Sequence, residues 1–109
     1  MSEEILSQIK KEVEGNKITL FIKGTADMPM CGFSARTIAI FKELGKPFNA
    51  VDILPDPRIR EVLSSYSNWP TIPQIFINGK FVGGCDIVME MYQKGELKPI
   101  VEEAFKDPA

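Results

Sequence analysis

The stretch ITLFIKGTADMPMCGFS, residues 18–34, decides the fold of this chain. Its first five residues, Ile18 to Ile22, are apolar and rich in β-branched and aromatic side chains, which predicts a buried strand. Residues 24–30 then form a polar loop that contains glycine and proline. A helical pattern of apolar residues begins at Phe33, so Cys31-Gly32-Phe33-Ser34 lies between the end of a strand and the start of a helix.

Cys31 and Ser34 have the spacing of a C-x-x-C redox motif, with serine at the second sulfur position. The Cys31 thiol therefore has no cysteine three residues away with which to form a disulfide. It must use a thiol from a small molecule or from a second chain, or it must bind a metal centre. A helix start lowers the pKa of a thiol, because free backbone N–H groups and the helix dipole favour an anion.

Three neighbours of Cys31 are candidate parts of the same site. Lys23 ends the strand and would add positive charge beside the thiol. Gly32 lets a ligand approach the backbone closely, and Phe33 offers an apolar wall. The competing interpretation is that Cys31 is a small buried apolar residue, as free cysteines often are. Its place after a loop and at a helix start favours the reactive role.

The composition is that of one compact domain, residues 1–109. The net charge of −2 is spread without a block of like charges, which argues against a nucleic-acid partner. No apolar run approaches the roughly 20 residues that span a membrane, and the acidic start Met1-Ser2-Glu3-Glu4 is unlike a signal peptide. Two cysteines are too few for a disulfide framework and favour a reducing, cytoplasmic compartment. The chain has no histidine, which excludes Cys–His nucleophile pairs and mixed Cys/His zinc sites.

The rest of the chain alternates strand and helix patterns, and Asn78-Gly79 between two apolar runs is a strong hairpin signal. A strand–helix–strand half followed by a hairpin and a helix is thioredoxin-like topology. We therefore expect an α/β fold with a four-stranded mixed sheet flanked by helices. The predicted helices cover residues 3–14, 33–44, 57–66, 87–94 and 99–105, and the predicted strands cover residues 18–22, 48–54, 74–77 and 80–82.

Two further segments offer groups that a ligand could use. If the Ile72-Pro73 bond is cis, the backbone of Ile72 faces a cleft and can pair with an extended peptide; the alternative is an ordinary proline-rich turn. Gly84 permits close backbone approach before a helix that Asp86 would cap, and such a helix start favours a carboxylate. Asp86 would in turn accept a hydrogen bond from a ligand amine, although a routine hairpin exit explains the same residues. Cys85 is either a second thiol near the site or a buried filler, and the buried role is favoured.

Together these segments resemble the monothiol glutaredoxins of the C-G-F-S class, in their single-domain form. The resemblance covers nearly the whole chain. Its motifs, in chain order, are Lys23-Gly24, Pro29-x-Cys31-Gly32-Phe33-Ser34, Val51-Asp52-Ile53, Asn68-Trp69-Pro70-Thr71-Ile72-Pro73-Gln74, Gly83-Gly84-Cys85-Asp86-Ile87 and the segment from Met91 to Leu97. One departure is Ala26, because the family often has proline at this position of the loop.

The resemblance implies a thioredoxin fold that binds glutathione in its cleft. Lys23 and Arg60, the latter otherwise a solvated helix residue, would meet the glycine carboxylate of glutathione. Ile72, which precedes the cis proline, would pair with the cysteinyl backbone of the tripeptide. The amide of Cys85 and the carboxylate of Asp86 would hold the γ-glutamyl end.

The resemblance also implies a cargo. In this family two chains share one 2Fe–2S cluster, which is ligated by the motif cysteine of each chain, here Cys31, and by two glutathione thiols. Such proteins carry clusters to apo iron–sulfur acceptor proteins and often pair with BolA-like partners. Such clusters usually require four thiolates, and the two cysteines of one chain cannot supply them. Two chains that each give one cysteine, together with two external thiols, reach this number.

We therefore expect a glutathione-dependent cluster carrier that is a homodimer when loaded, without a membrane or nucleic-acid partner. The alternative is a monothiol oxidoreductase, in which Cys31 attacks glutathione mixed disulfides and free glutathione resolves the product. The long loop at residues 24–30, which in the family is associated with poor disulfide-reductase activity, favours the carrier and at most weak enzyme activity. A third possibility, an adaptor that does not use the thiol, would need no cysteine of lowered pKa.

Overall fold

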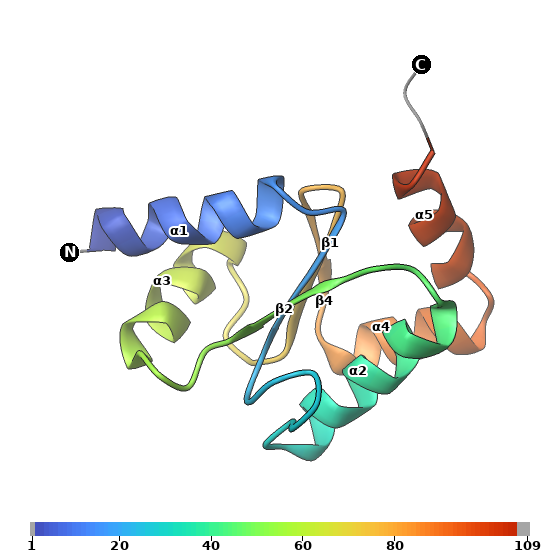
Figure 1. Cartoon of the computed structure of the whole chain (residues 1–109), viewed down its shortest axis with the longest axis horizontal. Helices are drawn as coiled ribbons and strands as arrows, with labels where there is room; N and C mark the ends of the chain where they lie inside the picture. The colour runs from blue at the N-terminus through green and yellow to red at the C-terminus, as the bar shows by residue number, and fades with distance from the viewer. Residues whose placement is uncertain (1, 107–109) are drawn as a thin grey trace.

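The computed structural model describes residues 2–106, which form five helices and four strands (Figure 1). No helix in this range is long and apolar enough to cross a membrane. The helices are α1 (Ser2–Glu14), α2 (Gly32–Leu44), α3 (Pro57–Ser67), α4 (Cys85–Gln93) and α5 (Leu97–Ala104). The strands are β1 (Ile18–Ile22), β2 (Asn49–Asp52), β3 (Gln74–Ile77) and β4 (Lys80–Gly83).

The four strands form one sheet in the order β2-β1-β3-β4. β1 is parallel to β2 and antiparallel to β3, and β3 continues into antiparallel β4 through a hairpin. Asn78 and Gly79 in the hairpin turn both have positive φ, 55° and 80°, as the predicted turn requires. The predicted four-stranded mixed sheet with flanking helices is therefore confirmed.

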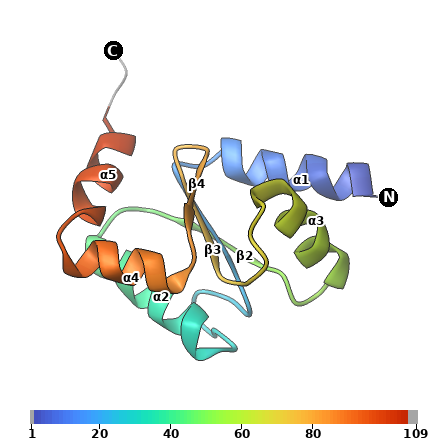
Figure 2. The same cartoon turned by 180° about the vertical axis from the view of Figure 1, so that it is seen from behind.

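Helices cover both faces of the sheet, with α1 and α3 on one face and α2, α4 and α5 on the other (Figures 1 and 2). The central strand β1 contributes to both cores, and all five of its residues are buried. Ile18, Leu20 and Ile22 belong to the cluster that includes side chains of α2, α4 and α5, while Phe21 packs with those of α1 and α3. A strand buried on both faces is mostly apolar, which made β1 visible in the sequence, and the hydroxyl of its one polar residue, Thr19, is bonded to the Glu12 carbonyl.

Local capping sets the ends of the helices that border the site. The Asp56 side chain accepts the Arg58 backbone N–H at 3.0 Å and caps α3 ahead of Pro57. Gly45 ends α2 in the left-handed conformation. The start of α2 is one residue earlier than expected, at Gly32, and Cys31 is its N-cap. Cys31, the candidate reactive thiol, is therefore the N-cap residue of α2.

Two element boundaries in the body of the fold were predicted wrongly. The strand expected over residues 48–54 is shorter, because the parallel register with β1 runs only from Asn49 to Asp52. The last helix begins at Leu97 rather than at residue 99, and Leu97 is fully buried, so its first turn is held by packing. Apart from the start of α4, the other ends agree with the prediction to within one residue.

The start of α4 was also predicted wrongly, and this boundary lies at the candidate site. α4 begins at Cys85 rather than at Ile87, and its N-cap is Gly84 rather than Asp86. Gly84 has extended backbone (φ −99°, ψ −166°) and offers no side-chain cap, so the helix starts earlier than residue type alone suggests. Asp86 instead lies in the first turn of the helix with its side chain exposed.

Candidate functional site

Cys31 caps α2 with its sulfur, in the place where a side-chain oxygen usually caps a helix. Its backbone is extended (φ −150°, ψ 156°), and Sγ accepts the Ser34 backbone N–H at 3.3 Å. Sγ also lies 3.2 Å from the Ser34 hydroxyl oxygen. The neutral thiol can donate to this hydroxyl, whereas a thiolate can only accept the hydroxyl proton.

The Ser34 hydroxyl is itself held in a fixed place. Ser34 is fully buried, and its Oγ accepts the backbone N–H of Lys23 at 3.1 Å. Because Lys23 donates to this oxygen, the hydroxyl proton of Ser34 is free to point at Cys31. This donor–acceptor order favours the thiolate form of Cys31.

The pKa of Cys31 lies below that of an ordinary thiol. Partial burial raises this pKa, but the hydroxyl of Ser34, the backbone N–H groups of Ser34 and Phe33, and the charge of Lys23 together lower it by more. Cys31 is also partly exposed, so it is not the buried apolar residue of the competing interpretation. The structure therefore provides the electrostatic setting that the sequence predicted for a reactive thiol.

The loop between β1 and Cys31 is a hydrogen-bonded turn. Thr25 and Met28 bond each other through their backbones in both directions, at 3.1 and 3.2 Å, and the Met30 N–H donates to the Lys23 carbonyl at 2.8 Å. Gly24 has φ 96°, and a Cβ there would collide with the Met28 carbonyl oxygen, so the loop requires glycine at its start. Because Met30 bonds Lys23, the residue directly before Cys31 lies beside the end of β1.

A groove of about 460 Å³ adjoins the thiol, and its size suits a small ligand. It brings together residues from the end of β1, from α2 and α3, from the loop before β3 and from the start of α4. All predicted binding residues except Gly32 line the groove. Cys31 does not line it, but Phe33, two residues along the chain, and Lys23, whose charge acts on the thiol, both do. The lining residues are Lys23, Phe33, Arg60, Trp69, Thr71, Ile72, Pro73, Gly84, Cys85, Asp86 and Ile87.

Sequence reasoning gave no role to Trp69, Thr71 or Ile87, which also line the groove. The Trp69 ring packs against Phe81, with 5.6 Å between ring centroids. A Cβ on Gly84 would lie only 3.2 Å from Trp69 Nε1, so glycine at position 84 makes room for the indole. The tryptophan–proline pair marks a loop in the sequence but gives no signal for this contact.

Within residues 2–106, the charged side chains of the groove form no hydrogen bond or ion pair with another side chain, although the charge of Lys23 acts on Cys31. Lys23 and Arg60 provide two positive charges, and Asp86 provides a negative one; Arg60 and Asp86 are exposed. The Ile72-Pro73 bond is cis, which was the condition set by the sequence analysis. Free charges of both signs suit a ligand that carries carboxylates and an ammonium group.

Cys85 is 5% exposed, which confirms the favoured interpretation that it is buried, although it also lines the groove. Neither Cys85 nor Cys31 forms a disulfide. Across the described range there is no group of three or more His, Cys, Asp or Glu side chains that could hold a metal ion. Cys31 is therefore the accessible thiol of the two cysteines.

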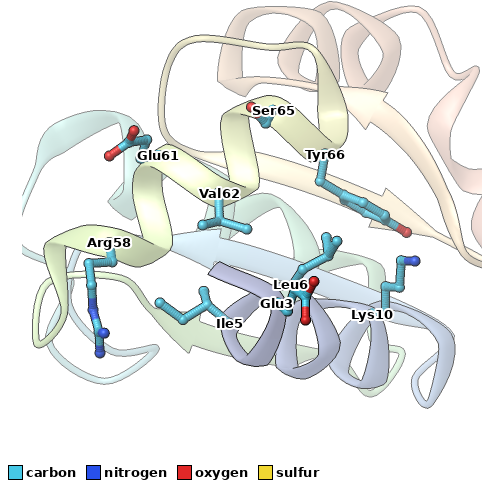
Figure 3. A pocket seen from close by; sticks show the side chains of 9 residues that line it. All are labelled: Glu3, Ile5, Leu6, Lys10, Arg58, Glu61, Val62, Ser65 and Tyr66. Carbon is cyan, nitrogen blue, oxygen red and sulfur yellow. The ribbon is translucent and has the colours of Figure 1, made fainter. Parts of the chain in front are cut away.

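A larger hollow of about 770 Å³ lies between α1 and α3 (Figure 3). Ile5 and Leu6 of α1 lie on one side of it, and Val62 and Tyr66 of α3 on the other. It contains no thiol, and none of the predicted site residues lines it. Volume alone does not identify a site, so the groove beside Cys31, where polar groups converge on a thiol, is the better candidate.

The sheet order, the thiol at the start of α2 and the adjoining groove define a thioredoxin-like protein with one accessible thiol. The Glutaredoxin family model matches residues 18–82. The chain belongs to the glutaredoxin family. It is 49% identical over 105 residues to a monothiol glutaredoxin of Synechocystis sp., itself uncharacterised, and the match covers 96% of this chain and 98% of that relative.

Two solved structures show the same fold. The reduced apo form of poplar GrxS14 is 48% identical, with 90% of each chain covered and a TM-score of 0.81. A buckwheat glutaredoxin–glutathione complex is 28% identical, with 94% of this chain and 92% of that chain covered and a TM-score of 0.84. These similarities confirm the predicted thioredoxin-like fold and the resemblance to monothiol glutaredoxins.

Proposed function

We propose that this protein binds glutathione in the groove and carries a 2Fe–2S cluster between two copies of the chain. One observation carries the proposal: a single accessible thiol of lowered pKa lies beside the groove, and serine occupies the place of a competing second thiol. As a thiolate, Cys31 can act as a ligand of iron, and it has no neighbouring cysteine with which to form a disulfide.

Support for glutathione comes from the charges of the groove and from its backbone. Glutathione has two carboxylates, one ammonium group and one thiol. We assign its glycine carboxylate to Lys23 and Arg60, its cysteinyl backbone to Ile72, and its γ-glutamyl end to the amide of Cys85 and the carboxylate of Asp86. The buckwheat structure of the same fold is a complex with glutathione, which fits this assignment.

The thiol count supports a cluster shared between two chains. A 2Fe–2S cluster usually needs four thiolate ligands. Each chain offers Cys31, because Cys85 is buried, and each bound glutathione would add one more thiol. Two chains and two glutathiones therefore supply four ligands. The cluster is cargo, and the chain's own part is to keep Cys31 deprotonated and to hold the glutathione thiol beside it.

The surface around the thiol supports contact with another protein. Met28, Met30 and Phe33 are 72%, 66% and 55% exposed, and all three lie within three residues of Cys31. Exposed apolar side chains gathered at one place often mark a contact surface. In our proposal a second copy of the chain covers this surface in the loaded state. Apo iron–sulfur acceptor proteins or a BolA-like partner replace that copy during transfer.

Anaerobic reconstitution with iron, sulfide and glutathione, followed by visible absorption and size-exclusion chromatography, tests the proposal. The expected product is a coloured dimer that requires both glutathione and Cys31. Cys31→Ser should remain colourless and monomeric. Colour that survives this substitution, or that forms equally without glutathione, would show that the ligand assignment is wrong.

A second candidate function is favoured by the lowered pKa of Cys31, since a thiolate also attacks disulfides. In a monothiol reaction, Cys31 attacks the glutathione sulfur of a mixed disulfide and the target protein leaves as a thiolate. A second glutathione thiolate then attacks the Cys31–glutathione disulfide, which restores Cys31 and yields oxidised glutathione. High turnover of a glutathione mixed-disulfide substrate would rank this function above cluster transfer.

A further inference from the structure

Gln74, the first residue of β3, is a fully buried polar side chain that the proposed function does not use. Its amide nitrogen donates to the carbonyl oxygens of Trp69 at 2.9 Å and of Thr71 at 3.3 Å. Both acceptors belong to the loop of residues 68–73 between α3 and β3. One side chain thus fastens the loop at two points on either side of Pro70.

This loop contributes a large part of the groove, although Gln74 itself does not line it. Trp69 and Thr71, whose carbonyl groups Gln74 holds, both line the groove, as does the following residue Ile72. Any ligand that pairs with the backbone of Ile72 therefore meets a loop that Gln74 bonds at two carbonyl groups. Gln74 acts on the groove through the loop and not by direct contact.

The amide oxygen of Gln74 is buried at a cost in folding free energy. Gln74 Oε1 is buried and has no hydrogen-bond partner among residues 2–106. Gln74 lies opposite Phe21 on the central strand, and an apolar side chain there would remove the unpaired oxygen but would leave the carbonyl oxygens of Trp69 and Thr71 without this donor. The benefit that offsets this cost is the pair of bonds that the amide nitrogen makes to the loop.

We propose that Gln74 is a positioning residue that fixes the 68–73 loop in the shape required to bind the backbone of a glutathione-like tripeptide. A loop held in its bound shape before the ligand arrives loses less conformational entropy on binding. The inference rests on the proposed function only for the identity of the ligand. The fixing of the loop by Gln74 can be measured without any ligand.

The test compares Gln74→Met with Thr19→Val in the reduced apoprotein. Gln74→Met keeps the length of the side chain and removes the donor. Thr19→Val is the matched control, because Thr19 is equally buried and its hydroxyl donates to the Glu12 carbonyl at 2.8 Å, at a position that does not line the groove. Thr19→Val loses one buried side-chain-to-backbone hydrogen bond, and Gln74→Met loses two. Gln74→Leu, which also removes the donor and buries no charge, is the second variant if Gln74→Met does not fold.

Isothermal titration with reduced glutathione gives the first readout. We expect Gln74→Met to bind about five- to tenfold more weakly than wild type, and Thr19→Val to bind as wild type does. Amide hydrogen exchange without ligand gives the second readout, with faster exchange in Gln74→Met only at Trp69, whose N–H donates to the Ser64 carbonyl at 3.2 Å. Equal affinity and equal exchange in the two variants would overturn the inference. If wild type binds no glutathione, the proposed function fails, and the exchange rates alone then decide the role of Gln74.

Discussion

The hydroxyl oxygen of Ser34 lies 3.2 Å from the sulfur of Cys31 and accepts the Lys23 backbone N–H at 3.1 Å. Ser34 is therefore a hydrogen-bond partner of the thiol as well as the residue that replaces a second cysteine. Its backbone N–H also bonds the sulfur, so one residue supplies two of the interactions that stabilise the thiolate. Substitutions at position 34 separate these two roles.

Ser34→Ala should raise the pKa of Cys31, because it removes the hydroxyl that stabilises the thiolate and leaves the opposing effect of burial in place. Alkylation by iodoacetamide requires the thiolate. Its rate rises as the pH passes through the pKa, so the whole profile of the variant should move to higher pH. At neutral pH the rate should fall several-fold. Mass spectrometry of the peptide that contains Cys31 separates its alkylation from that of Cys85.

Thr37→Val is the control for Ser34→Ala within the same helix. Thr37 is fully buried and its hydroxyl donates to the Phe33 carbonyl at 3.0 Å, without a bond to the sulfur. Both variants should lose about 1–2 kcal/mol of unfolding free energy for a buried hydrogen bond. Only Ser34→Ala should change the pH profile of Cys31. An equal shift in both variants would attribute the effect to general loosening of the helix.

Ser34→Cys should convert the site to an internal disulfide and reduce cluster binding. The Ser34 oxygen lies 3.2 Å from Cys31 Sγ, so a sulfur at this position faces Cys31 and can approach to the bond length of about 2.05 Å by side-chain rotation. The oxidised variant should then show no free thiol at position 31 and no coloured dimer after reconstitution. Thiol counting with and without reductant, followed by reconstitution in each state, is the measurement. A variant that remains reduced in air and loads normally would contradict the competing-disulfide role.

Lys23→Met and Arg60→Met should each weaken glutathione binding by about tenfold, because each removes a positive charge from the groove. Their effects on the thiol should differ. Lys23 contributes to the lowered pKa of Cys31 and Arg60 does not, so only Lys23→Met should move the alkylation profile to higher pH. Lys94→Met is the control, since Lys94 bonds Glu90 at 2.8 Å on α4 and does not line the groove. Unchanged glutathione affinity in both groove variants would remove the carboxylate assignment.

Most of the fold follows from local patterns that leave few alternatives. The apolar run of β1, the Asn78-Gly79 turn and the Asp56 cap each depend on neighbouring residues only. The cap of α4 was predicted wrongly because it depends on backbone conformation at Gly84, and an aspartate nearby was a plausible but incorrect choice. The role of Gln74 could not be predicted, since its partners are loop carbonyls that have no residue-specific signal.

Most residues that line the groove were predicted, mainly through resemblance to a family. The packing contacts between these residues were not predicted. Nothing in the sequence shows that Trp69 lies against Gly84, because this contact joins a loop to the start of a distant helix. The hollow between α1 and α3 was not predicted for a similar reason, since it depends on how two helices separated along the chain pack together. Contacts between elements are the part of the site that requires coordinates.

Gly84→Ala should disturb the groove while Gly32→Ala should not. A Cβ at position 84 would lie 3.2 Å from Trp69 Nε1 and 3.4 Å from the Pro73 carbonyl oxygen, so the indole must move. A Cβ at position 32 meets nothing within 4 Å, and the first turn of α2 accepts alanine readily. Both glycines were predicted to allow close ligand approach, but within the chain only Gly84 is tightly surrounded.

Trp69 is the only tryptophan of the chain, so its fluorescence reports the displacement directly. Gly84→Ala should change the emission of Trp69 and weaken glutathione binding several-fold, because the loop that carries Trp69 also lines the groove. Gly32→Ala should leave the emission unchanged and keep or slightly raise the thermal midpoint. If Gly84→Ala left both emission and affinity as in wild type, the indole would not need the space that glycine provides. If Gly32→Ala alone weakened binding, glutathione would approach the backbone at position 32 instead.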